Sequence, residues 1–240
     1  AKIAVKPKDT SKVYGETPVF ELESDNNLIT AAELAEFTKS TVFTSDGTAA
    51  NAPANENGYA ISAQLTSSET DNLILEVGGT GTLTVAKAPL TIKVKDVSRE
   101  YGAENPALEV EYSGFVNGED ESVLSGELKL SYDSSINGQT AVDTYTGVTS
   151  AAGLTSGNYE IAYVNGNVEI TKISISASAG AVGRTHITVV LDREIEGLTK
   201  SNFVVKDSSN RTITLAEVIA SADNKSYILS GSFAAGTEYT

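Results

Sequence analysis

"KVKDVSREYGA", residues 93–103, shows how this chain is organised, because the chain contains the same motif twice. The earlier copy reads "KPKDTSKVYGE" and spans residues 6–16, 87 positions before the later one. A proline follows each copy, at Pro18 and Pro106. Self-similarity at a fixed offset indicates that a structural unit is itself repeated. The sequence therefore predicts two related modules.

The closing stretches of the two copies also match. "NLILEVGGTGTLTVAK" ends the first copy, and "NYEIAYVNGNVEITK" ends the second. We therefore place the modules at residues 1–88 and 89–173, and a third unit of different character at residues 174–240. The third unit stops at "GTEYT", where a last alternating strand begins, so we expect it to be truncated at its C-terminal end.

Alternating apolar and polar residues dominate all three units, for example in "LTIKVKD", "ALEVEY" and "HITVVLD". This period is typical of strands with one buried face. Asn165-Gly166 lies between two such runs and predicts a hairpin with a type I′ turn. The predicted fold class is mainly β: an elongated tandem array of three small domains. The two repeats would be β-grasp-like or immunoglobulin-like, each with at most one short helix, and the third an immunoglobulin-like sandwich.

One helix is predicted, in "LITAAELAEF". Thr30 is followed three residues later by Glu33, which is a capping-box pattern. Three apolar residues would then lie near one face of the helix: Ile29, Leu34 and Phe37.

An acidic triplet, Glu119–Glu121, occupies the corresponding place in the second repeat, within "SGFVNGEDESVL". We expect Asn117 or Gly118 to turn the chain and the triplet to form a first helical turn, where carboxylates are favoured. A calcium or substrate site is the alternative. The first copy has Thr-Ala-Ala-Glu there, so the repeat does not require the carboxylates. Two apolar residues would pin the turn to the core: Val123 and Leu124.

Composition excludes several kinds of site. The chain has no Cys, Met or Trp and a single His, so disulfides and thiolate chemistry are excluded. Its formal net charge of −15 disfavours nucleic acid and anionic membranes. No apolar run approaches the roughly 20 residues of a membrane helix. We expect the chain to have no catalytic residue and to bind no cofactor or metal. We also expect it to be a monomer.

Other stretches that could hold a site favour plain structure. His186 lies in an alternating run, on the face opposite its apolar neighbours, and predicts an exposed or half-exposed strand residue. Asp133–Thr144 resembles a calcium loop but has Thr144 where the bidentate Glu should be. Gly78–Leu83 and Ser178–Thr185 are glycine-rich but lack a P-loop lysine. Carboxylate pairs of the glycosidase kind are not excluded, because such residues need only meet in space.

Tyr14 and Tyr101 each precede a glycine that we expect to lie in a turn. The favoured interpretation is a buried tyrosine whose hydroxyl holds a loop. A ligand-binding aromatic residue is the alternative.

A family resemblance rests on these elements. "YGAENPALEVEYSGFVNGEDESVLSGELKL", followed by "TYTGVTSAAGLTSGNYEIAYVNGNVEITK", resembles the MBG-type repeat of bacterial surface proteins. The resemblance covers residues 89–173 well and residues 1–88 only at their two ends. The first copy lacks Gly-Phe-Val-Asn-Gly and has Leu73 where the second has Tyr159, so it looks like a divergent copy. The third unit resembles the immunoglobulin-like modules of S-layer and surface proteins.

The resemblance implies tandem extracellular modules in adhesin-like chains, with no catalytic residues to carry over. Our first hypothesis is a non-enzymatic surface fragment that acts as a stalk or scaffold. The alternatives are an adhesin module that binds a glycan or protein of a host or neighbouring cell, and an accessory region of a larger secreted enzyme.

Overall fold

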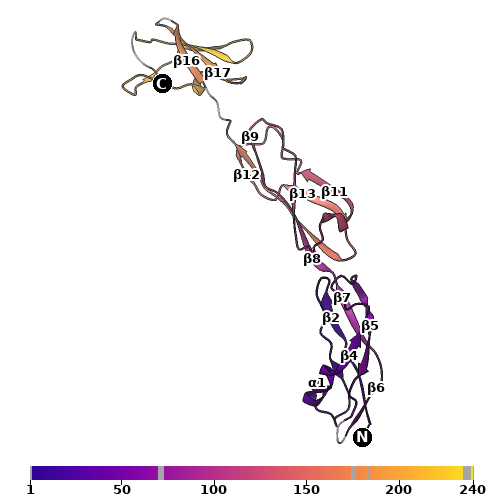
Figure 1. Cartoon of the computed structure of the whole chain (residues 1–240). Coiled ribbons are helices and arrows are strands. Elements are labelled where there is room, and N and C mark those ends of the chain that lie inside the picture. Colours follow the sequence, from indigo (N-terminus) through magenta and orange to yellow (C-terminus); the bar gives the residue numbers. More distant parts are fainter. Residues whose placement is uncertain (1, 70–72, 174–176, 183, 235–238, 240) are drawn as a thin grey trace. The chain divides into compact units, whose positions relative to one another are not determined.

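The structure is a computed structural model and describes residues 2–69, 73–173, 177–182, 184–234 and 239. The chain divides into two compact units, Ala1–Thr171 and Lys172–Thr240. Strands dominate both units, and the described residues form several small sheets and one α-helix (Figure 1). The prediction of a mainly β, multi-domain chain is confirmed.

The first unit contains two lobes, each with its own sheets. We call residues 2–86 the first lobe. Its sheets have the strand orders β3-β1-β6 and β2-β7-β5-β4. Its elements are β1 (Lys2–Pro7), β2 (Thr10–Val13), β3 (Leu22–Glu23), α1 (Ala31–Lys39), β4 (Thr41–Thr44), β5 (Asn55–Leu65), β6 (Ile74–Val77) and β7 (Gly81–Ala86).

We call residues 88–171 the second lobe. Its sheets have the orders β10-β8-β14, β12-β15-β9 and β11-β13. A single turn of 3₁₀-helix, η1, stands where the first lobe has α1. The elements are β8 (Ala88–Val94), β9 (Val97–Glu100), β10 (Val110–Ser113), η1 (Glu121–Val123), β11 (Ser125–Tyr132), β12 (Asp143–Tyr145), β13 (Thr149–Thr155), β14 (Tyr159–Val164) and β15 (Val168–Thr171).

Each lobe brings its opening and closing strands together in parallel. β1 runs parallel to β6 and β2 to β7 in the first lobe, and β8 runs parallel to β14 and β9 to β15 in the second. An immunoglobulin sandwich is built from two antiparallel sheets. The parallel pairs therefore distinguish both lobes from that fold, which was one of the two predicted alternatives.

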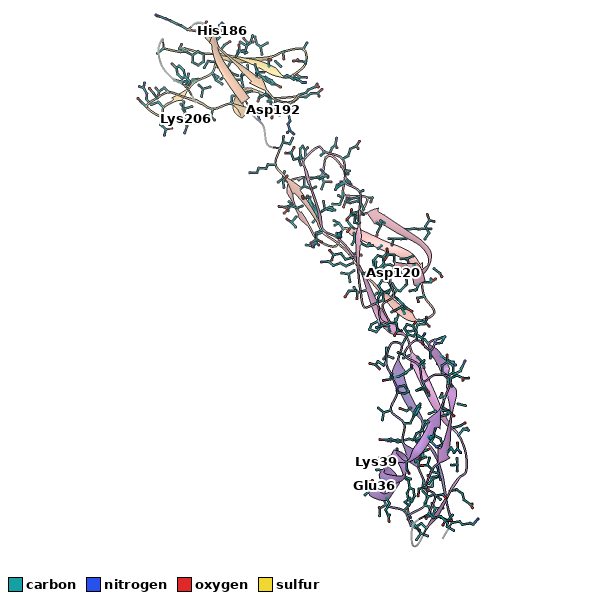
Figure 2. The ribbon with its side chains drawn as sticks, in the orientation of Figure 1. Glu36, Lys39, Asp120, His186, Asp192 and Lys206 are labelled. Carbon is teal, nitrogen blue, oxygen red and sulfur yellow. The ribbon has the colours of Figure 1, made fainter. Side chains whose placement is uncertain are left out.

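Helix α1 confirms the capping-box prediction. The Thr30 hydroxyl accepts a hydrogen bond from the Glu33 backbone N–H, and the Glu33 carboxylate accepts one from the Thr30 backbone N–H. Phe37 is buried in a core that Ile29 and Leu34 also contact. On the helix surface Lys39 pairs with Glu36, as labelled in Figure 2.

The predicted hairpin at Asn165-Gly166 is wrong. The flanking strands continue in one direction, because β14 pairs with β8 and β15 pairs with β9. Neither residue has a positive φ. Gly166 is required for another reason: a Cβ there would lie 2.6 Å from the carbonyl oxygen of Val94 on the neighbouring strand. Asn-Gly marks a close backbone approach at this position.

The aspartate that recurs in the repeated motif, Asp9 and Asp96, lies in each lobe between the first two strands and bonds at or beside a closing strand. The Asp96 carboxylate accepts a hydrogen bond from the Asn167 backbone N–H at 2.9 Å. The Asp9 carboxylate accepts one from the Thr82 backbone N–H at 2.7 Å. The bond from Asn167 lowers the pKa of Asp96. The aspartate thus recurs because it satisfies a donor where the parallel ladder is interrupted.

Among its described residues, the second unit forms a four-stranded antiparallel sheet, ordered β16-β17-β21-β20, and the pair β18-β19. Its core surrounds Tyr227, which is fully buried. We predicted a C-terminal truncation from residues 236–240, and of these the structure describes only Tyr239. Residues 174–176, at the predicted start of the third unit, also lie outside the described residues. The elements are β16 (Ala177–Val182), β17 (His186–Leu191), η2 (Lys200–Asn202), β18 (Val205–Lys206), β19 (Thr212–Ile213), β20 (Glu217–Ala220) and β21 (Ser226–Ser230).

Candidate functional site

The two lobes of the first unit are joined by a very short connection. β7 ends at Ala86 and β8 begins at Ala88, so a single residue, Lys87, joins them. The Lys87 ammonium donates a hydrogen bond to the Ser156 carbonyl at 2.9 Å. One apolar core continues across the connection, with members from both lobes: Tyr14, Ile61, Leu83, Val85, Ala88, Leu90 and Tyr159.

Glu119 lies at the centre of this connection. One of its carboxylate oxygens accepts a hydrogen bond from the Tyr14 hydroxyl of the first lobe at 2.6 Å, and the other accepts one from the Tyr159 hydroxyl at 2.5 Å. Both tyrosines are buried. The carboxylate thus links the two lobes through two charge-assisted hydrogen bonds, which are stronger than neutral ones. We call Tyr14, Gly15, Phe115–Glu119 and Tyr159 the junction site.

Aromatic packing surrounds the carboxylate. The rings of Tyr14 and Tyr159 lie 5.6 Å apart between centroids and 80° between planes, and those of Phe115 and Tyr159 lie 5.4 Å apart at 82°. These are edge-to-face pairs, which aromatic rings prefer. The Asn158 side chain adds a polar link between the lobes, because its oxygen accepts a bond from the Ala54 backbone N–H at 3.0 Å.

Gly15 allows the lobes to approach closely. Its φ is +96°, and a Cβ there would lie 2.6 Å from a methyl carbon of Val116. Any other residue would both strain the backbone and push the second lobe away. The predicted glycine turn is confirmed here, and its function is contact between lobes.

The turn that presents Glu119 is the one predicted from the sequence. Asn117 and Gly118 both have positive φ, at 56° and 74°. Asp120 begins η1, and its carboxylate accepts a hydrogen bond from the Ser122 backbone N–H at 2.9 Å. Hydrogen bonds from Ser122 lower the pKa of Asp120, which Figure 2 labels.

Two parts of that prediction need correction. Val123 does not pin the turn, because 41% of it is exposed, whereas Leu124 does pack against the shared core. Glu119 does not merely start a helical turn, because it bonds the two tyrosines. Sequence reasoning missed this role, since Tyr14 lies 105 positions away.

The environment keeps both phenols protonated. Burial, followed by the hydrogen bond to Glu119, raises the pKa of Tyr159 to about 12. The same causes raise the pKa of Tyr14. Each hydroxyl therefore remains a donor to the carboxylate throughout the neutral range.

Alkaline pH is expected to weaken the junction through Tyr159. Its folded pKa of about 12 exceeds the value of roughly 10 for an unfolded tyrosine, so the folded state binds the proton more tightly. The resulting stability is complete below pH ~10 and is lost as pH rises toward ~12. Urea unfolding of the natural chain and Tyr159→Phe across this range should show their stability difference shrinking. A difference that stays constant would contradict the assignment.

The prediction for Tyr101 is wrong, although its glycine turn is confirmed. Tyr101 is 41% exposed, and no hydrogen bond of its hydroxyl is found within the described part of the chain. Gly102 has a φ of +80°. The same local sequence therefore gives a buried tyrosine in the first lobe and an exposed one in the second.

Two buried cations were missed by sequence reasoning. Lys12 donates to the carbonyls of Glu16 and Ala49, and its burial lowers its pKa. Arg99 occupies the corresponding position, 87 residues later, and donates to the Asn105 side chain at 2.7 Å and to the Asn137 carbonyl. A basic residue at the same position of both repeats was the available signal. Each cation thus hydrogen-bonds both to a residue next to the Tyr-Gly turn of its lobe and to a more distant loop.

The other candidate sites that the sequence suggested lie outside the junction site. His186 is exposed on β17, as predicted and as labelled in Figure 2. Asp133 caps its own turn by accepting from the Ser135 backbone N–H, in a plain loop. Gly78–Leu83 leads into β7, and Ser178–Thr185 contains Gly183, which lies outside the described residues. No group of three or more potential metal ligands occurs among the described residues.

The hollows on the first unit include one cleft and one groove of notable size. A cleft of about 530 Å³ beside the junction is lined by Glu56, Lys87, Leu154 and Glu160 among others. A groove of about 390 Å³ lies between α1 and β3. Both volumes are in the range of small-molecule sites.

The fold and the junction site define a β-rich, multi-domain chain. Its first unit consists of two lobes that share an apolar core and are joined by hydrogen bonds. Within it, residues 90–169 match the family model of the MBG domain (YGX type). Domains of this type are associated with surface and adhesin-like proteins. No curated protein matches the chain. Among the described helices, none is both long and apolar enough to cross a membrane.

Proposed function

We propose that this chain is a non-catalytic modular region of a secreted or cell-surface bacterial protein, and that it acts as a stalk or scaffold in adhesion or display. We further propose its modules at residues 1–88, 89–173 and 174–240. The observation that carries the proposal is the junction site, in which a shared core and the Glu119 carboxylate hold two successive lobes. The MBG-type match supports an extracellular setting.

A spacer needs junctions that resist bending. Flexible linkers between domains are several residues long and rich in Gly and Ser. Here one residue separates β7 from β8. Bending at this point would expose buried residues of the shared core and separate Glu119 from Tyr14. Both effects cost free energy, so the junction favours a single geometry.

Small-angle scattering of the full chain tests the stalk directly. Three modules of about 35 Å each, with roughly ten strand residues at ~3.3 Å, would span about 100 Å in line. A thin rod of that length has a radius of gyration near ~30 Å, whereas a compact globule of this chain length would give about 18 Å. We expect a value near the first. A value near the second would overturn the stalk proposal.

A second candidate function has one observation in its favour. The groove between α1 and β3 belongs to the first lobe, and the second lobe has only η1 in place of that helix. A groove formed by a helix that the second lobe lacks is what a ligand-binding adhesin module would show. The groove floor is apolar at Leu22 and Leu34, with Lys8 and Glu21 at its rim. A compact scattering result would favour this function.

A further inference from the structure

The first and last strands of the second lobe lie side by side from end to end. We call residues 88–100, which contain β8 and β9, the opening segment, and residues 159–171, which contain β14 and β15, the closing segment. β8 pairs with β14 at six positions and β9 pairs with β15 at four, all in parallel. In Figure 1, β9 continues from β8 along the lobe. The two segments therefore form one long parallel ladder.

The register of this ladder does not change where the strands are interrupted. Every Cα pair of β8 with β14, and of β9 with β15, has the same separation in sequence, 71 positions. In the gap between the strands, the Asp96 carboxylate accepts hydrogen bonds from the backbone N–H of Asn167 at 2.9 Å and from its side-chain amide at 3.2 Å. Asp96 thus links the two segments where the backbone ladder is interrupted.

The ends of the ladder decide how tension along the chain would load it. The chain enters the lobe at Ala88, the first residue of the opening segment, and leaves it at Thr171, the last residue of the closing segment. Because the segments are parallel, these two residues lie at opposite ends of the ladder. Pulling on them slides one segment along the other, so that the evenly spaced hydrogen bonds bear the force together. Pulling on two neighbouring ends would instead break the bonds one after another.

The rest of the second lobe lies off this path. Force passes from the opening segment through the ladder to the closing segment, so residues 101–158 bear little of it until the ladder yields. The first lobe has the same arrangement, because β1 is parallel to β6 and β2 is parallel to β7. Lys2, where β1 begins, and Ala86, where β7 ends, likewise lie at opposite ends of their ladder.

We propose that the first unit bears tensile load, and that the parallel ladder of each lobe is the element that resists it. The proposal rests on the stalk function, because a stalk that holds a target away from a surface is pulled at its two ends. Forced unfolding is governed by the rate of unfolding and not by equilibrium stability. Resistance to load is therefore a property of its own, which can be measured apart from stability and shape.

Pulling the second lobe in two directions, within the full chain, tests the proposal. The chain contains no Cys, so two introduced cysteines determine where the handles attach. Ala86→Cys with Lys172→Cys pulls on opposite ends of the ladder, and Ala103→Cys with Lys172→Cys pulls on neighbouring ends. All three residues are exposed. In single-molecule force spectroscopy at one pulling speed, the first pair should unfold the lobe at a several-fold higher force. Equal forces in the two directions would overturn the proposal.

Asp96 provides a second test, with Asp133 as its matched control. Both side chains are exposed, and each accepts a hydrogen bond from a backbone N–H at 2.9 Å, but Asp133 lies within residues 101–158. Under a constant force between opposite ends of the ladder, Asp96→Ala should unfold several-fold faster, because one charge-assisted bond no longer resists sliding. Asp133→Ala should leave that rate unchanged. If both variants speed forced unfolding equally, the ladder is not the element that resists load.

Scattering and force measurements separate this proposal from the stalk proposal. A rod-like radius of gyration together with equal forces in the two pulling directions would overturn load bearing and leave the stalk standing. A compact radius of gyration would overturn the stalk whatever force is measured. A rod-like chain whose second lobe resists pulling at opposite ends far better than at neighbouring ends is the expected result.

Discussion

Replacing Glu119 by alanine is expected to lower the free energy of unfolding of the first unit by about 3 kcal/mol. A hydrogen bond to a charged group contributes about 1.5–3 kcal/mol, and Glu119 makes two, to Tyr14 and Tyr159. Glu119 is half-buried, so water compensates part of the loss. Urea denaturation followed by far-ultraviolet circular dichroism measures the change.

Glu121 provides the matched control two residues away. It is exposed on η1, and Glu121→Ala should change stability by no more than about 0.5 kcal/mol. Glu119→Gln keeps two polar atoms but loses the charge, and should fall between the two alanine variants. The double variant Glu119→Ala with Tyr14→Phe should lose less stability than the sum of the two single variants. The reason is that each single change already removes the same Tyr14–Glu119 hydrogen bond. Equal effects of Glu119→Ala and Glu121→Ala would contradict the junction site.

Local features were predictable because their causes lie within a few residues. The capping box of α1 needs only Thr30 and Glu33, and the turn before Glu119 needs only Asn117 and Gly118. In each case the side chain or glycine acts on its own backbone. The strand period likewise predicted the exposed face of β17 at His186.

The junction site could not be predicted, because it depends on which surfaces meet. Tyr14 and Tyr101 lie in nearly the same local sequence and make the same backbone bonds, yet one is buried and the other exposed. The difference comes from the following loop, which covers only Tyr14. Comparing the repeats even pointed away from Glu119, since the first copy lacks the acidic triplet. A residue that bonds a preceding lobe need not recur in every copy.

The prediction of a hairpin at Asn165-Gly166 was wrong for a different reason. The close backbone approach at Gly166 leads to the second large expected effect, a loss of stability. Gly166→Ala is expected to cost about 3 kcal/mol or more, at the upper end of overpacking. Its Cβ would lie 2.6 Å from the Val94 carbonyl oxygen and 2.9 Å from that of Lys95. Both are backbone atoms of the neighbouring strand segment, so they cannot rotate away. Denaturant unfolding of the variant measures the cost.

Gly157 is the control for Gly166. A Cβ there meets nothing within 4 Å, and its φ is not positive. Gly157→Ala should therefore be neutral or slightly stabilising, since alanine restricts the unfolded chain. If Gly166→Ala were as mild as Gly157→Ala, the close approach to Val94 would be wrong.

Asn165→Val separates the parallel crossing from the predicted hairpin. A type I′ turn would hold Asn165 at positive φ, where a β-branched residue is strongly disfavoured. In the structure φ is negative, and the side chain makes one exposed hydrogen bond, to the Gly147 carbonyl at 3.1 Å. Asn165→Val should then cost only about 1 kcal/mol, the net value of one hydrogen bond. A small cost here beside a large one at Gly166 fits only the parallel crossing, because a hairpin turn would penalise both positions for the same backbone reason.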